Sequence, residues 1–515
     1  MQYSRYATNP ILPGFYPDPS ICRVEDDYYL VTSSFAFFPG VPIFHSRDLR
    51  HWEQIGHVLT RSSQLPLNCR RISGGIYAPT LRYHDGVFYM ITTNVDGIGD
   101  FVCTATDPRG PWSEMHVIEN APGIDPSLFF DEDGICYMCG NEWGKGEPWI
   151  WAAEFDTKTF SLKGERKRLW QGALRNAWAP EAPHLYFRDG YYYLMIAEGG
   201  TEFFHAVTIA RSKNIFGPYE GFRGNPILTH RHLGKGYPIS NTGHADLVEN
   251  RDGSWHMVLL ASRPYGGYHL NMGRETFMVP VVWEDGWPVV NPGVGHVDWL
   301  CPVPDLEDWI PPQQDEDAFT SPVWNHLGCP QGLDPVTIGE NTLRIRCIAP
   351  PLVPEGEESE IVKAHALGFL GRRQQHMSFE ARVKVSVPPE EGVSCGLVVL
   401  QNDFASLRIE LTRRESGVEA RAVQVWKDGR NGPLEEAVLG LSAAMETEEL
   451  VIRASGQSFA LMLGDWTVAT AEGGFMGSES CGGFVGAYIG LFASGNGEDR
   501  ECEAVFTDFH YTGIR

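Results

Sequence analysis

The sequence predicts an almost all-β protein in which a five-bladed β-propeller is followed by a C-terminal β-sandwich. Three observations lead to this fold class. A hairpin pattern recurs five times within residues 1–300, alternating apolar runs fill residues 327–515, and helical periodicity is nearly absent throughout. A chain of 515 residues is also long enough to form two separate hydrophobic cores.

The repeat joins a turn-forming segment to a strand that begins about ten residues later with Asp-Gly or Asp-Asp and continues mostly with aromatic residues. Asp and Gly tolerate the positive φ angles of tight turns between twisted strands, so each copy predicts a hairpin. Hairpins recurring at roughly 50 to 60 residues are typical of a radial array whose units pack against their neighbours. The five copies open at Asp18, Ala78, Asp125, Glu181 and His244.

A change of composition divides the chain. Residues 1–300 hold all five repeats and are predicted to form the propeller. Residues 301–326 are predicted to be a linker, because their first part, Cys301–Asp317, is rich in proline and acid and suits a surface connection. Residues 327–515 contain period-two runs such as Met377–Val385, which are typical of half-buried strands, and are predicted to form a jelly-roll-like sandwich.

The charge of the chain limits its partners. The formal net charge of −25 argues against nucleic acid and anionic membranes, which bind clustered Lys and Arg, and favours a small neutral substrate. No segment approaches the length of a membrane-spanning helix, and the first ten residues lack the apolar core of a secretory signal. We therefore expect a cytoplasmic location.

The repeat also predicts where function lies. The first residue of each copy opens the innermost strand of its blade, so the five openings converge on the propeller axis. Three of these residues are carboxylic acids: Asp18, Asp125 and Glu181. Holding like charges close together is costly unless they have partners or a task, so this cluster predicts acid and base chemistry. The alternative for each Asp that precedes Pro is a turn-forming role, in which the carboxylate accepts a hydrogen bond from a nearby backbone amide.

Several motifs resemble glycoside hydrolase family 43, specifically its two-domain β-xylosidase branch. The resemblance covers nearly the whole chain and implies a five-bladed propeller with a sandwich. It also implies an inverting, exo-acting enzyme that releases xylose from the non-reducing end of β-1,4-xylo-oligosaccharides. The motifs are Asn9–Ser20, Ser33–Leu49, Asn241–Asp246, Gly273–Thr276 and Gly368–Gln375.

The resemblance assigns a role to each of the three carboxylates. It implies that Asp18 is the general base, Glu181 the general acid and Asp125 the modulator of the acid's pKa. Inversion needs one carboxylate to activate water on one side of the sugar and one protonated carboxyl to protonate the departing oxygen on the other. Asp125 is expected to raise the pKa of Glu181 by like-charge repulsion. The two carboxyls of an inverting pair lie about 6.5–9.5 Å apart, and we expect this separation between Asp18 and Glu181.

Four further residues are expected to bind the sugar. The resemblance places Arg274 on the substrate, and the planar guanidinium has a shape that can hold sugar hydroxyls and Asp125 together; the alternative is a surface or interblade ion pair. His244 is expected to support the arginine as a neutral imidazole. In some relatives this position binds a structural calcium ion on the axis, which is the less favoured role here. Phe35 and Tyr77 are expected to form an aromatic platform for the sugar ring, and Tyr77 stands where many relatives carry Trp.

Other expectations stay open at this point. No cofactor is expected to be required, and relatives of this kind are often homo-oligomers. The resemblance also implies that an aromatic loop of the sandwich closes the site, but the sequence does not place that loop. Two alternative functions remain: an α-L-arabinofuranosidase, or a bifunctional xylosidase and arabinofuranosidase, at the same site, and a non-catalytic sugar-binding protein. The presence of all three carboxylates argues against the second.

Overall fold

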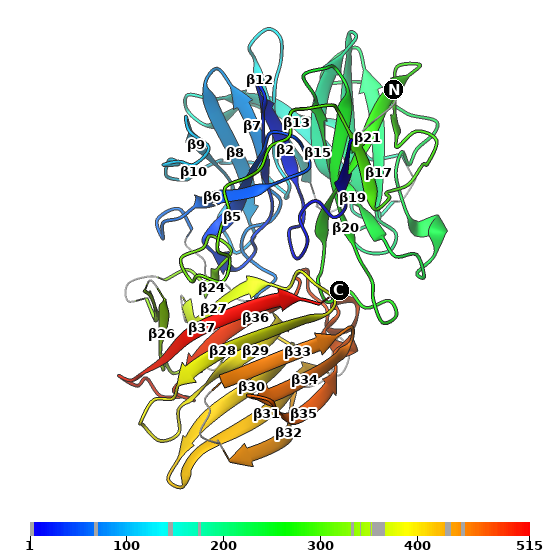
Figure 1. The fold of residues 1–515 in the computed structure, drawn as a ribbon. Helices are drawn as coiled ribbons and strands as arrows, with labels where there is room; N and C mark the ends of the chain where they lie inside the picture. Colours follow the sequence, from blue (N-terminus) through cyan, green and yellow to red (C-terminus); the bar gives the residue numbers. More distant parts are fainter. Residues whose placement is uncertain are drawn as a thin grey trace.

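Five small sheets surround one axis, and two larger sheets form a sandwich beneath them in the computed structural model (Figure 1). This confirms the predicted fold class. The structure describes residues 5–65, 71–142, 148–173, 177–330, 334–339, 341–350, 352, 366–427, 434–443 and 449–514.

Each blade is a four-stranded antiparallel sheet built from one continuous stretch of chain. The first strands of neighbouring blades contact one another, so these strands line the axis. The strands of the five blades are, in order, β2 (Ser20–Val24), β3 (Asp27–Val31), β5 (Gly40–Ser46) and β6 (Glu53–Leu59); β7 (Thr80–His84), β8 (Val87–Asn94), β9 (Gly99–Ala105) and β10 (His116–Val117); β11 (Ser127–Phe130), β12 (Cys136–Glu142), β13 (Trp149–Asp156) and β14 (Ser161–Trp170); β15 (Glu181–Arg188), β16 (Tyr191–Glu198), β17 (Ala206–Ser212) and β18 (Glu220–Gly221); and β19 (Ser240–Glu249), β20 (Trp255–Ser262), β21 (Glu275–Glu284) and β22 (Trp287–Val290).

The predicted hairpins form where the Asp-Gly signals stand. Asp85 and Gly86 both have positive φ, at 47° and 82°, and connect β7 to β8. Asp189 and Gly190 do the same between β15 and β16, with φ of 48° and 73°. These are the left-handed conformations that a tight turn between twisted strands requires, which is why this dipeptide marks the repeat.

A buried ion pair ties the inner strands together on the axis. Asp246 of β19 is fully buried and accepts hydrogen bonds from both terminal nitrogens of Arg82 on β7, at 2.8 and 3.1 Å. It also accepts hydrogen bonds from the hydroxyls of Ser20 on β2 and Tyr186 on β15, both at 2.7 Å. Blades one, two, four and five therefore meet at one carboxylate. Although burial opposes ionisation, Arg82, His184 and these hydrogen bonds hold the pKa of Asp246 well below its usual range.

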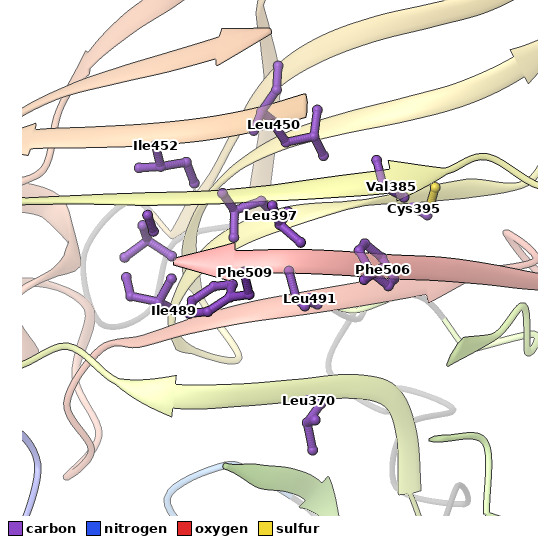
Figure 2. Packing of buried hydrophobic residues seen from close by; sticks show 14 of the residues in the cluster. Leu370, Val385, Cys395, Leu397, Leu450, Ile452, Ile489, Leu491, Phe506 and Phe509 are labelled. Atoms are coloured by element: carbon purple, nitrogen blue, oxygen red, sulfur yellow. The ribbon is translucent and has the colours of Figure 1, made fainter. Parts of the chain in front are cut away.

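The sandwich consists of an eight-stranded and a seven-stranded sheet. Figure 2 shows side chains from both sheets meeting in its core, among them Leu397, Ile452 and Phe506, all of which are fully buried. Alternating strands such as β28 bury every second residue, as the period-two pattern predicted. The strands are, in sheet order, β32 (Leu434–Ala443), β31 (Gly417–Lys427), β30 (Ala405–Arg414), β29 (Ser394–Asn402), β36 (Tyr488–Ser494), β27 (Ala366–Arg373), β24 (Asn325–Gly328) and β4 (Phe37–Phe38); and β25 (Val336–Ile338), β26 (Thr342–Arg346), β37 (Glu503–Gly513), β28 (Phe379–Ser386), β33 (Glu449–Ser455), β34 (Ser458–Leu463) and β35 (Trp466–Glu472).

The two domains share a sheet. Strand β4 lies in the first blade's part of the sequence, yet it pairs with β24 and forms the edge of the eight-stranded sheet. The ring of Phe37 stacks on Tyr488 of the sandwich at 3.8 Å, and Arg373 donates a hydrogen bond to the carbonyl of Phe15. The sandwich is thus packed firmly against the propeller face that carries the site described below.

Between the domains, β23 (Leu300–Val303) pairs with the first strand, β1 (Arg5–Thr8), and so joins the two ends of the propeller. The predicted domain limits at residues 300 and 327 stay a prediction. Helix is scarce in the described residues, where the single α-helix is α1 (Ser478–Cys481) beside the short 3-10 turns η1 (Arg231–Leu233) and η3 (Gly474–Met476). No helix of the described part of the chain is long and apolar enough to cross a membrane.

We predict that Asp246→Asn destabilises the protein by about 3–5 kcal/mol, because the change leaves the Arg82 charge buried without its partner. The pKa of Asp246 is depressed in the folded protein, so its contribution to stability is present above the ordinary Asp pKa and is lost as the pH falls toward the folded value. Denaturant unfolding at neutral pH measures the loss. Asp252→Asn, at an exposed turn of the same blade, serves as the control; equal midpoints for the two variants would contradict the assignment.

Candidate active site

The residues that open the blades point their side chains toward one end of the axis, because the backbone at or next to several of them has positive φ. Asp18 and Asp125 both have φ of 56°, and His244 has φ of 45°. In the fourth blade the left-handed residue is Ala182, directly after Glu181, where the β15–β16 register shifts. Such conformations are uncommon for residues other than Gly and redirect the side chain at the start of a strand.

These side chains line a cavity of about 90 Å³ at the axis. The cavity brings together six of the seven predicted site residues, from segments that are far apart in the sequence. Its described lining consists of Asp18, Tyr77, Ala78, Ile124, Asp125, Glu181, Thr201, His244, Arg274 and Phe484.

Asp18 is set up to be ionised. Its Oδ1 accepts a hydrogen bond from the Arg274 guanidinium at 2.7 Å, and its Oδ2 accepts one from the Ser33 hydroxyl at 2.6 Å. Burial alone would raise the pKa of Asp18, but the Arg274 charge, the neighbouring His244 ring and the Ser33 hydrogen bond outweigh it and hold this pKa below its usual range. A carboxylate of this kind can accept a proton from water.

Glu181 is set up to hold a proton. Burial raises the pKa of Glu181 to about 8, the negative charge of Asp18 adds to the rise, and Arg274 opposes it. Burial also raises the pKa of Asp125, together with the charges of Glu181 and Asp18. The buried carboxyls disfavour one another's ionisation, so the cavity contains the ionised Asp18 together with two carboxyls, Glu181 and Asp125, that favour the protonated form. This is the charge arrangement that acid–base hydrolysis needs.

Arg274 pairs with a different carboxylate from the one expected. The sequence led us to expect a contact with Asp125, whereas the guanidinium binds Asp18, the Thr201 hydroxyl at 3.0 Å and the Phe484 carbonyl at 3.1 Å. The geometry explains the difference, because Arg274 precedes β21 of blade five, which neighbours blade one across the closed ring. Arg274 therefore fixes the base directly.

His244 lies beside the same pair. Its Nδ1 is 3.6 Å from Asp18 Oδ1. Burial lowers the pKa of His244, and although Asp18 opposes this, the Arg274 charge adds to the lowering, so the ring is neutral near pH 7. In the described part of the chain, no group of three or more His, Cys, Asp or Glu side chains is arranged to hold a metal ion.

Of the two residues expected to form the platform, one lines the cavity and the other lies behind it. Tyr77 lines the cavity and is half-buried. Phe35 does not line it; its ring packs behind Tyr77 at 5.2 Å and under the Arg274 guanidinium at 5.7 Å. Phe35 thus supports two residues that face the cavity, and direct contact between Phe35 and a sugar stays a prediction.

Four residues of the lining had no predicted role in the site: Ala78, Ile124, Thr201 and Phe484. Phe484 belongs to the sandwich, in the loop that follows α1. Its backbone N–H donates to the Ser73 hydroxyl at 3.0 Å, its ring lies 6.4 Å from that of Tyr77, and its carbonyl accepts from Arg274. This is an aromatic loop of the sandwich at the site, of the kind that the resemblance implied without placing. Thr201 follows β16 and carried no motif.

Comparisons with known proteins agree with this architecture. The chain matches the family model of glycosyl hydrolases family 43 over residues 7–288 and that of the β-xylosidase C-terminal concanavalin A-like domain over residues 318–512. A xylosidase/arabinosidase of Butyrivibrio fibrisolvens is 42% identical, over 96% of this chain and 98% of the relative. A non-reducing end α-L-arabinofuranosidase of Bacteroides ovatus is 38% identical, over 98% of this chain and 94% of the relative.

Among solved structures, a xylan β-1,4-xylosidase from Bacillus halodurans superposes with a TM-score of 0.87 at 34% identity, covering 98% of this chain and 99% of that one. With its catalytic-type carboxylates gathered in one cavity and both domains matched, the chain belongs to glycosyl hydrolase family 43, in the two-domain branch with a β-xylosidase C-terminal domain, and is a glycosidase.

Proposed function

We propose that this protein is an inverting exo-β-xylosidase that removes xylose from the non-reducing end of β-1,4-xylo-oligosaccharides. One observation carries the proposal: Asp18, whose pKa its partners lower, and Glu181, whose pKa burial raises, face the same small cavity. The presence of xylosidases among the similar proteins supports the choice of sugar.

In the proposed reaction, Asp18 takes a proton from a water molecule while the water oxygen bonds to the anomeric carbon. Glu181 gives its proton to the glycosidic oxygen as the bond between that oxygen and the anomeric carbon breaks. Arg274 keeps Asp18 ionised and oriented, and the repulsion between Asp125 and Glu181 disfavours a state in which both are ionised. The small volume of this cavity, about 90 Å³, supports action at a chain end.

A second candidate function is α-L-arabinofuranosidase activity, alone or beside the first. It is favoured by the names of two similar proteins, a xylosidase/arabinosidase and an α-L-arabinofuranosidase. The ratio of kcat/KM for 4-nitrophenyl β-D-xylopyranoside and 4-nitrophenyl α-L-arabinofuranoside separates the two. A dominant rate on the arabinoside would replace xylosidase as the main activity. Assembly into a homo-oligomer remains part of the proposal and is checked by light scattering.

Glu181→Gln is predicted to lower kcat on xylobiose by about 10²- to 10⁴-fold, because the amide cannot protonate the leaving sugar. The loss should be much smaller on 4-nitrophenyl β-D-xylopyranoside, since nitrophenolate departs without a proton. Binding of xylobiose, measured by calorimetry, should persist. Equal losses on both substrates would remove Glu181 from the role of acid.

Hydrolysis is predicted to proceed with inversion, so the first product of a β-xyloside is α-xylose. Proton NMR of the anomeric signals during the first minutes distinguishes the two outcomes. First-formed β-xylose would instead require a covalent intermediate and a shorter distance between the carboxyls, about 5–5.5 Å.

The pH profile of kcat/KM is predicted to be bell-shaped. Activity requires ionised Asp18, so it should rise as the pH passes the depressed pKa of that residue, and it requires protonated Glu181, so it should fall above about pH 8. In Asp125→Asn the second buried carboxyl can no longer ionise beside Glu181, so the repulsion that opposes ionisation of Glu181 is removed and the alkaline limb should move to lower pH. An unchanged alkaline limb in that variant would exclude Asp125 as the modulator.

A further inference from the structure

A second and larger cavity, which we call the side cavity, lies next to the catalytic one. It has a volume of about 360 Å³ and lies between the loops of blades four and five and the sandwich. Thr201, Arg274 and Phe484 line both cavities, so the two are neighbours that share one wall. The proposed hydrolysis of a single xylose unit leaves the side cavity without a function.

The side cavity does not border the acid. A departing sugar must touch Glu181, which protonates the bond being broken, and neither Glu181 nor Asp125 lines the side cavity. Asp18 does not line the side cavity either, but its partner Arg274 does. An occupant of the side cavity therefore does not touch the acid and is not the first sugar of the leaving group, whereas it lies beside the arginine that holds the base.

The lining suits a sugar. Phe203, Phe204 and Tyr268 supply aromatic surface, and Phe204 is 64% exposed. Pyranose and furanose rings pack their C–H faces on such rings. Asn241 and Ser262 add buried polar groups, and the Asn241 side chain is held by a 2.7 Å hydrogen bond from the Tyr268 hydroxyl.

The charges of the lining favour a neutral ligand. The lining contains two carboxylates, Glu202 and Glu479, and one ammonium, Lys235, which lies 4.7 Å from the centre of the Tyr268 ring. Glu479 is already paired with His269 at 2.9 Å. The Arg274 charge is already paired with Asp18 at 2.7 Å. An anionic substituent such as a uronic acid would gain nothing from this balance, whereas a neutral pentosyl unit loses little on entering.

We propose that the side cavity is a subsite for a second neutral pentosyl unit carried by the sugar that is being cleaved, so the enzyme also releases intact disaccharides from substituted chain ends. The inference rests on the proposed glycosidase function and extends its substrate class. The bond broken is still the one that Glu181 protonates, and the bond within the disaccharide stays whole.

The test uses the full-length protein and four 4-nitrophenyl glycosides. One is the plain β-xyloside, and the other three carry a further xylose on O2, O3 or O4 of that unit. At least one of the three should yield nitrophenol together with an intact disaccharide, seen by chromatography before any free xylose, with kcat/KM within about tenfold of that for the plain xyloside.

Two variants in the side cavity sharpen the test. Phe204→Ala should lower kcat/KM for the accepted disaccharide glycoside by about two- to tenfold, because one packing face is lost. Ser478→Trp, which fills the cavity, should abolish that reaction. Both should leave the plain xyloside unaffected. Trp466→Ala, which removes another exposed aromatic ring on distant strand β35, is the matched control and should change neither substrate.

The outcomes separate the two proposals. If the plain xyloside is hydrolysed but none of the three substituted ones gives an intact disaccharide, the side cavity is not this subsite and the xylosidase proposal stands. If Phe204→Ala and Ser478→Trp leave disaccharide release unchanged, the reaction does not use the side cavity and the inference also fails. If neither the plain xyloside nor xylobiose is hydrolysed, the xylosidase proposal falls and the subsite falls with it.

Discussion

The buried contact between Asp246 and Arg82 is the interaction on which the remaining architecture depends. An isolated charge on the propeller axis would be prohibitively costly, so each of these side chains requires the other at hydrogen-bonding distance. The pair can form only when the inner strands of blades one, two, four and five lie in one fixed arrangement around the axis. Asp18 and His244 each lie two residues before a member of this network, Ser20 and Asp246. The positions of the base and its neighbouring imidazole are consequently set by the contact that closes the ring.

Two chemically similar carboxyls of the site have opposite roles because their surroundings shift their pKa values in opposite directions. Asp18 and Glu181 are both buried carboxyls, and burial acts on both in the same direction. They differ because Arg274 donates directly to Asp18, while Glu181 feels the negative charge of Asp18. The contact with Arg274 thus makes the pKa of Asp18 lower than that of Glu181. A single cavity can therefore contain both a proton acceptor and a proton donor. Asp125 adds a third carboxyl whose own ionisation is suppressed.

The sandwich is part of the site as well as its neighbour. Strand β4 leaves the first blade to join the eight-stranded sheet, and the loop after α1 returns to place Phe484 against Tyr77 and the Arg274 guanidinium. The sandwich, which lacks the catalytic carboxylates, therefore supplies part of the wall of both cavities. Propeller and sandwich therefore need to fold together for the pocket to have its shape, and differences in the loop around Phe484 would alter specificity without touching the acid or the base.

The sequence by itself determined the repeat, the fold class and the three carboxylates, because each follows from local rules. Asp-Gly turns set the hairpins, and equivalent positions of equivalent blades must converge on one axis. Only the tertiary structure decided that Arg274 donates a hydrogen bond to Asp18, that Phe35 lies behind the cavity lining, and that Phe484 completes the site. These facts depend on how the ring closes and how the sandwich docks. Contacts between segments hundreds of residues apart leave no periodic trace in a single sequence, since they are fixed by packing and charge in three dimensions.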